Sequence, residues 1–124
     1  MIEGIVNDYL EATVSLSAEG PRGQQRSIDA VIDTGFSGEL SLPPWLVVDL
    51  GLTYESQVQA ILANGATETL SLYRARLIWD NRAIDVLAAE SDAPPLVGMS
   101  LLKDHELRIE ASPGGRVRIS TLAP

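Results

Sequence analysis

Three consecutive residues, Asp33, Thr34 and Gly35, place an acid, a hydroxyl group and a flexible backbone position at one point of the sequence. The preceding run, Ala30-Val31-Ile32, is apolar and ends in β-branched residues, which is typical of a buried strand. Because carboxylates are rarely buried unless they are paired, an acid directly after such a strand either caps a turn or is held for proton transfer. Asp and Gly are also common turn residues, so the triplet alone leaves both interpretations open.

The composition limits the classes of protein to which the chain can belong. With 124 residues it has the length of one domain, and we expect a single domain over residues 1–124. The absence of Cys excludes thiol catalysis and thiolate metal sites. The net charge of −8 disfavours nucleic acid and anionic membranes as partners. No apolar run has the length of a signal peptide or a membrane span, so the sequence predicts a soluble, cytoplasmic protein.

The residues around the acid predict the elements that must position it. Leu10 to Ser17 alternate between apolar and polar side chains, which predicts a half-buried strand. Glycine and proline within Ala18 to Gln25 predict a turn, and Arg26 to Ile32 return as a strand that ends at the acid. Beyond it, residues 39–42 are short and extended. Pro43 to Gly51 predicts a brief helix with proline in its first turn and glycine at its end.

The second half of the chain predicts further strands separated by turns. Val58 to Ala63 and Thr67 to Tyr73 flank Asn64-Gly65, a dipeptide that strongly favours a hairpin. More strands are expected over residues 74–79, 83–89, 107–109 and 117–119, with one or two helical turns over residues 99–104. The pattern is mostly β with one or two short helices, which indicates a small barrel or sandwich.

Three features together resemble the retropepsin-like aspartic proteases, in particular their small prokaryotic single-lobe members. They are the apolar strand ending in Asp33-Thr34-Gly35, the hairpin centred on Asn64-Gly65, and the step Leu96-Val97-Gly98 followed by Leu101-Leu102. Their order and approximate spacing match, over residues 10 to 110. The resemblance implies a single-lobe acid-protease barrel that is completed as a homodimer.

The resemblance also assigns roles to the matching residues of the motif. Asp33 is the expected catalytic carboxylate, and Thr34 is expected to brace the two active-site loops across the dimer. The backbone of Gly35 is expected to lie against the carboxylates. Gly98 is expected to pass so close to the catalytic loop that any Cβ would collide.

The same resemblance places a flap over a bound peptide. Ala63, Asn64 and Gly65 are the expected flap tip, although an ordinary hairpin would show the same signal. Phe36 stands where relatives commonly have Ala or Ser, so its ring either narrows a substrate pocket or packs inward. Ser100 stands where many relatives place Asp or Asn.

The implied chemistry is hydrolysis of peptide bonds by two carboxylates. A single acid cannot act at once as a general base toward water and a general acid toward the scissile amide. The chain has no second Asp followed by Thr-Gly or Ser-Gly, so Asp33 of a second copy is expected to complete the site on a two-fold axis. The expected partners are a peptide or protein substrate and a second copy of the chain, with no metal and no organic cofactor.

The sequence also leaves two alternative functions open and predicts the places of several further residues. Phe36 and the altered flap leave room for a catalytically silent dimerisation or peptide-binding module, and an unrelated β-barrel whose Asp33 caps a turn is the third interpretation. His105 is expected on the surface and Asp29 is expected to be solvated or hydrogen-bonded. Trp45 and Trp79 are expected in core or dimer contacts. Either the last hairpin, residues 107–119, or the N-terminal residues 1–6 could pair across the two-fold axis.

Overall fold

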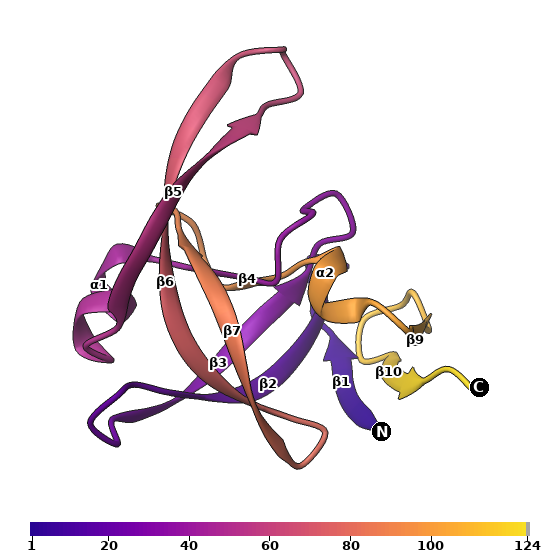
Figure 1. Ribbon diagram of the computed structural model, residues 1–124. Helices are drawn as coiled ribbons and strands as arrows, with labels where there is room; N and C mark the ends of the chain where they lie inside the picture. The colour runs from indigo at the N-terminus through magenta and orange to yellow at the C-terminus, as the bar shows by residue number, and fades with distance from the viewer. Residues whose placement is uncertain (124) are drawn as a thin grey trace.

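The computed structural model describes residues 1–123 and consists mainly of β-strands, with two short helices (Figure 1). The strands are β1 (Ile2–Val6), β2 (Ala12–Glu19), β3 (Gln25–Ile32), β4 (Leu40–Leu42), β5 (Thr53–Ile61), β6 (Thr67–Trp79), β7 (Arg82–Glu90), β8 (Leu96–Val97), β9 (His105–Ile109) and β10 (Arg116–Thr121). The helices are α1 (Pro44–Asp49) and α2 (Met99–Leu102). Within residues 1–123, neither helix is long and apolar enough to cross a membrane.

Six of the strands close into a barrel. The sheet order runs β5-β6-β7-β4-β8-β3-β2-β1-β10-β9. The six strands from β6 to β2 in this order form the barrel, which is closed by an additional pairing between β6 and β2. The pairs β3–β8 and β4–β7 are parallel, whereas the other pairs of the barrel are antiparallel. Strand β5 continues beyond the barrel as half of a projecting hairpin with β6 (Figure 1).

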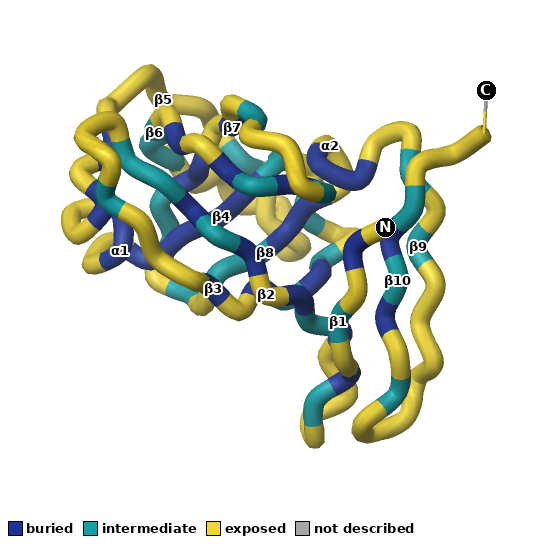
Figure 2. Tube along the Cα trace, turned by 90° about the horizontal axis from the view of Figure 1, so that it is seen from below, coloured by how far each residue is buried: buried dark blue, intermediate teal, exposed yellow. Residues whose placement is uncertain are grey.

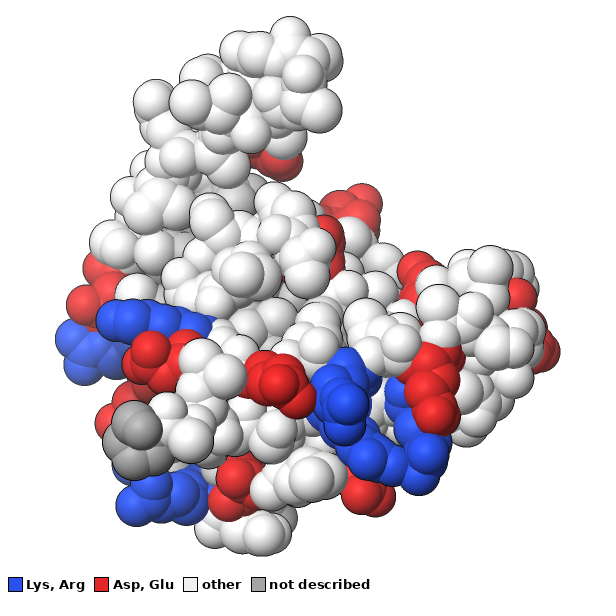
Figure 3. Space-filling view, turned by 90° about the vertical axis from the view of Figure 1, so that its right-hand side faces the viewer, with Lys and Arg blue, Asp and Glu red and all other residues white. Residues whose placement is uncertain are grey.

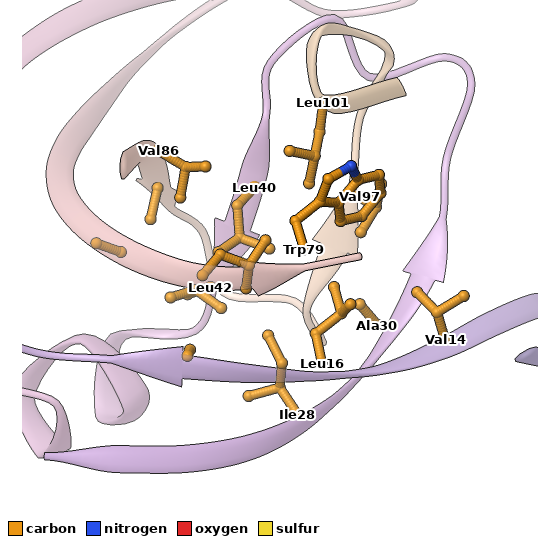
Figure 4. Packing of buried hydrophobic residues seen from close by; sticks show 14 of the residues in the cluster. Val14, Leu16, Ile28, Ala30, Leu40, Leu42, Trp79, Val86, Val97 and Leu101 are labelled. Atoms are coloured by element: carbon orange, nitrogen blue, oxygen red, sulfur yellow. The ribbon is translucent and has the colours of Figure 1, made fainter. Parts of the chain in front are cut away.

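The barrel interior follows from the alternation of side chains along the strands. Every second residue of β2 is buried, because successive side chains of a strand point to opposite faces. These residues are Ala12, Val14, Leu16 and Ala18. Leu40 and Leu42 from β4 are fully buried, and Figure 4 shows both among the side chains of the core. Burying a leucine side chain contributes roughly 1.5–3 kcal/mol, so these residues hold β4 in the centre of the structure.

The expected fold class, a mostly β barrel with one or two short helices, is confirmed, but several element boundaries differ. For example, β5 begins at Thr53 rather than at Val58. The sequence predicts separate strands before and after Tyr73, whereas β6 is one strand of 13 residues. No turn residue separates Tyr73 from Arg74, and β7 pairs with β6 from Leu72 onward while β5 still pairs with it up to Arg74. The second strand begins at Ala12 rather than at Leu10, because Leu10 adopts a left-handed backbone (φ 59°) in the preceding turn.

The two ends of the chain form an extension of the sheet beside the barrel. Strand β1 pairs with β2 on one side and with β10 on the other, and β10 also pairs with β9 (Figure 2). Residues 1–6 and the last hairpin, the two candidates for pairing across a two-fold axis, are therefore paired with each other within one chain. Among the described strands, the outer edge of β9 ends the sheet on this side.

Candidate active site

Asp33 emerges from β3 at the point where this strand meets β8. The register pairs Ile32 with Val97, and the backbone N–H of Asp33 continues the pairing by donating to the carbonyl oxygen of Val97 at 2.9 Å. The Oδ1 atom of Asp33 accepts the N–H of Gly35 at 2.9 Å, and its carbonyl oxygen accepts the N–H of Phe36 at 3.1 Å. Asp33 thus stabilises a turn, but this does not exclude a chemical role, because the same turn fixes the carboxylate in space.

The loop after Asp33 is held from below by the start of α2. The N–H of Gly98 donates to the carbonyl oxygen of Glu39 at 2.9 Å, and the N–H of Met99 donates to that of Phe36 at 2.8 Å. A Cβ built on Gly98 would lie 2.1 Å from the carbonyl oxygen of Gly38, so no larger residue fits without displacing the loop. Ser100 adds a hydrogen bond from its hydroxyl group to the carbonyl oxygen of Ser37.

The ring of Phe36 belongs both to this packed loop and to the surface above it. Cβ atoms built on Gly38 and Gly98 would lie 2.5 Å and 2.6 Å from ring atoms of Phe36, so the ring covers both glycines. The residue is half-buried and also lines the adjacent cleft. The ring of Phe36 therefore packs inward against the loop and also borders the cleft.

A hairpin of β5 and β6 projects from the barrel above the loop (Figure 1), and its turn holds the residues that were expected at a flap tip. We refer to this hairpin as the flap. At its tip, the N–H of Gly65 donates to the carbonyl oxygen of Leu62 at 2.9 Å, and Oδ1 of Asn64 accepts the N–H of Ala66 at 2.9 Å. Gly65 has a φ of 82°, which glycine adopts without strain. Ala63, Asn64 and Gly65 are all exposed, so the tip stands free of the barrel.

The base of the flap is braced by side chains from both strands. The rings of Tyr54 and Tyr73 make an edge-to-face contact with centroids 5.8 Å apart. Arg74 on β6 forms an ion pair with Glu55 on β5. Partial burial raises the pKa of Tyr73, and the nearby carboxylate of Glu90 acts in the same direction. The hairpin is therefore anchored at its base and open at its tip.

A cleft of about 840 Å³ separates the flap from the loop. Its floor includes Asp33, Gly35 and Phe36, and its walls include Leu70 and Leu72 from β6. Thr34, Gly98, Ala63, Asn64 and Gly65 are not among the described residues that line it. The structure thus brings only part of the predicted set to the cleft.

Several residues that line the cleft were not identified by the sequence analysis. Their common feature is that apolar side chains occur at every second position of a strand. Leu70 and Leu72 follow the flap turn at alternate positions, which places their side chains on one face of β6. Leu87 and Ala89 repeat this pattern on β7, and both line the cleft. This alternation predicts a strand. It does not show whether the apolar face of the strand borders a cleft or the core.

The remaining candidate residues have structural contacts. His105 is half-buried rather than on the open surface, because its Nε2 atom accepts the indole N–H of Trp79 at 3.3 Å. Asp29 is exposed and accepts the Ser15 hydroxyl at 2.5 Å. Trp79 is in the core, whereas Trp45 is 65% exposed on α1. Among residues 1–123, no group of three or more His, Asp or Glu side chains is arranged to hold a metal ion.

Comparisons with known proteins support the fold. No protein-family model matches the sequence, and no curated protein sequence matches it. Among solved structures, the chain is similar to EIAV protease complexed with the inhibitor HBY-793, with a TM-score of 0.55 and 14% sequence identity. The match covers 76% of this chain and 86% of the EIAV protease chain. The chain therefore has a retropepsin-like fold.

Proposed function

We propose that the protein is an aspartic endopeptidase whose active site forms between Asp33 residues of two copies. The observation that carries this proposal is the position of Asp33 on the floor of a cleft that a hairpin covers from above. The similarity to EIAV protease supports the same assignment at the level of the fold. Residues 1–124 would act as one domain, and the cysteine-free sequence supports a reducing, cytoplasmic environment.

The proposed mechanism uses two carboxylates as one acid–base unit. Carboxylates about 3 Å apart cannot both ionise, so the pair shares one proton. One Asp33 removes a proton from a water molecule that attacks the peptide carbonyl carbon. The other Asp33 donates the shared proton to the carbonyl oxygen, which gives a tetrahedral gem-diol. The first Asp33 then passes the proton taken from water to the leaving nitrogen as the C–N bond breaks, and the second Asp33 takes a proton back from a gem-diol hydroxyl group, which restores the singly protonated pair. No metal or organic cofactor takes part in these steps.

The neighbouring residues would position this pair and the substrate. Thr34 is exposed next to Asp33, which suits the proposed contact with the other subunit's loop. Gly35 lines the cleft and its N–H already holds one carboxylate oxygen. The close approach of Gly98 to the loop would keep Asp33 at a fixed height below the flap.

Substitution of the acid tests the proposal. Asp33→Asn should abolish cleavage of a peptide library between acid and neutral pH, because Asn cannot share or transfer the proton. Asp29→Asn is the matched control, since Asp29 is an exposed residue of β3, the strand that leads to Asp33, and Asn at this position keeps a hydrogen-bond acceptor for Ser15. A statine-type transition-state mimic should block the activity of the parent protein. If Asp33→Asn cleaves as well as the parent, the assignment is wrong.

The dimer is tested separately by sedimentation. The parent protein and Asp33→Asn should both form dimers, because the substitution removes a charge but leaves the loop intact. A protein that stays monomeric under all conditions, with or without the statine mimic, would contradict the two-copy site.

A catalytically silent peptide-binding module is the second candidate, and the ring of Phe36 beside Asp33 is the observation that favours it. In that case the parent would bind peptides without cutting them. Phe36→Ala would then restore cleavage only if the ring is what blocks the reaction.

A further inference from the structure

The charged side chains that line the cleft are all acidic. They are Asp33, Glu39 and Glu68, and within residues 1–123 no Lys, Arg or His lines the cleft. Figure 3 shows the same asymmetry, because on this face Lys and Arg lie in the lower half while the flap and the region just below it show only carboxylates as charged groups. The charged groups of the cleft therefore favour positively charged ligands over negatively charged ones.

Glu68 lies on the cleft-facing side of the flap. It is the second residue of β6 and pairs with Ala60 of β5, which also lines the cleft. Leu70 and Leu72 follow at alternate positions on the same face and line the cleft as well. A carboxylate near the tip is thus followed by two apolar side chains toward the base of the flap.

Glu39 brings a second carboxylate to the opposite wall. Its Oε1 atom accepts the backbone N–H of Leu87 at 2.9 Å, and its own carbonyl oxygen accepts the N–H of Gly98. These bonds fix the residue beside Leu87, an apolar side chain that also lines the cleft. Each wall of the cleft therefore combines an acid with a leucine.

We infer that the cleft selects extended peptides that carry a Lys or Arg side chain among apolar ones, with Glu68 as the main specificity residue and Glu39 as the second. This inference rests on the proposed function. Long cationic side chains pack their aliphatic stems on apolar surface while the charged head reaches a polar partner, which matches walls that alternate leucine and carboxylate. Acidic peptides are repelled by the same groups, and the net charge of −8 reinforces the selection.

The experiment compares two peptides that differ in one charge. A cleaved sequence from the library is prepared with Lys or with Nε-acetyllysine near the scissile bond, and kcat/KM is measured for both. For the parent protein, acetylation should lower kcat/KM about fivefold, the effect of a partly exposed ion pair. The preference should shrink as salt is raised, because salt screens exposed charges.

Two variants assign the effect to the cleft. Glu68→Gln should remove most of the difference between the two kcat/KM values, and Glu39→Gln should remove a smaller part of it. Glu19→Gln makes the same change of charge at the end of β2, where Glu19 accepts a hydrogen bond from Gln25 at 2.8 Å, and should leave the ratio unchanged. A parent protein that cleaves both peptides equally would overturn the inference, and so would a preference that survives in both Glu68→Gln and Glu39→Gln.

A binding measurement separates this inference from the proposed function. If the parent protein cleaves no peptide, the proposed function fails, and fluorescence anisotropy of the two labelled peptides then tests the charge selection alone. Tighter binding of the Lys peptide that is lost in Glu68→Gln supports the inference. Equal binding of the two peptides, or no binding, overturns it.

Discussion

The floor and the roof of the cleft are built by opposite means. The loop that carries Asp33 is tied to α2 by several backbone hydrogen bonds, and Gly98 lies against it so closely that a Cβ would reach 2.1 Å from the carbonyl oxygen of Gly38. The flap tip makes hydrogen bonds within its own turn, and a Cβ on Gly65 would meet nothing within 4 Å. The loop on the floor is fixed by contacts with neighbouring residues, whereas the flap tip has few contacts outside its own turn.

The difference matches the demands of the proposed reaction. Acid–base chemistry requires a carboxylate in a fixed position, because misplacement of a catalytic group by about 1 Å can cost about a hundredfold in rate. A lid that admits a peptide must open, and such segments are drawn from the least stable parts of a fold. The structure therefore places the tightly packed loop below the cleft and the loosely held flap tip above it.

Amide hydrogen exchange should show the largest contrast between the two regions. The N–H groups of Asp33 and Gly98 are bonded within the packed floor and should exchange only when the whole protein unfolds. The N–H groups of Leu62 and Gly65, at the exposed tip, should exchange through local opening, at least about a hundredfold faster relative to their intrinsic rates. Similar protection at both places would remove the distinction between floor and flap.

Substitution of Gly98 should destabilise the protein more than any flap substitution. Gly98→Ala forces a methyl group into the space of the Gly38 carbonyl oxygen, and overpacking of this kind typically costs about 1–3 kcal/mol. Urea denaturation should show a loss near the upper end of that range, with displacement of the Asp33 resonances in NMR spectra. A change below about 0.5 kcal/mol would mean that the floor is not tightly packed.

The matched substitution in the flap should have a smaller and more local effect. Gly65→Ala places a Cβ in a left-handed conformation, with free space around it, at a cost of about 1 kcal/mol. The expected outcome is faster exchange at the flap tip and a change in global unfolding free energy well below that of Gly98→Ala. Equal destabilisation by the two variants would show that the flap unfolds together with the barrel.

The hairpin of β9 and β10 should show the smallest effect on stability. Unlike the flap tip, it is held by an ion pair beside its turn. The side chain and the backbone N–H of Arg116 hydrogen-bond to Glu110, which lowers the pKa of that carboxyl from 4.5 to about 2. A lowered native pKa stabilises the fold above pH 4.5, and this contribution is lost as the pH falls from 4.5 toward 2. NMR titration should give a midpoint near the lower value, and Arg116→Gln should return it toward the upper one. Because both groups are exposed, the effect on stability should be slight.

Much of the fold could be read from local patterns. Alternation predicted most of β2, Asn64-Gly65 predicted the flap turn, and proline followed by glycine predicted α1 close to its observed bounds. These features depend on side-chain period and turn chemistry, which are local properties of the chain. The continuous β6 was missed because its two halves pair with different neighbours, and sequence alone does not show pairing.

The site was predictable where chemistry and local structure coincide. Asp33, Gly35 and Phe36 do line the cleft, but Leu70 and Glu68 were not foreseen. Their positions depend on how far the flap leans over the barrel, which is a tertiary property. The pairing of β1 with β10 was also missed, because residues at the two ends of the chain meet only in the folded state.

The unbroken course of β6 has a mechanical consequence for the flap. The same strand runs from Trp79 in the core to Thr67 beside the tip, so the flap has no loop on that side at which it could pivot. Its partner β5 carries an irregular register between Tyr54 and Ser56, near the base. Opening of the flap would therefore require both strands of the hairpin to bend near this irregularity. Because β6 continues into the barrel, this bending would strain the part of β6 that pairs with β7.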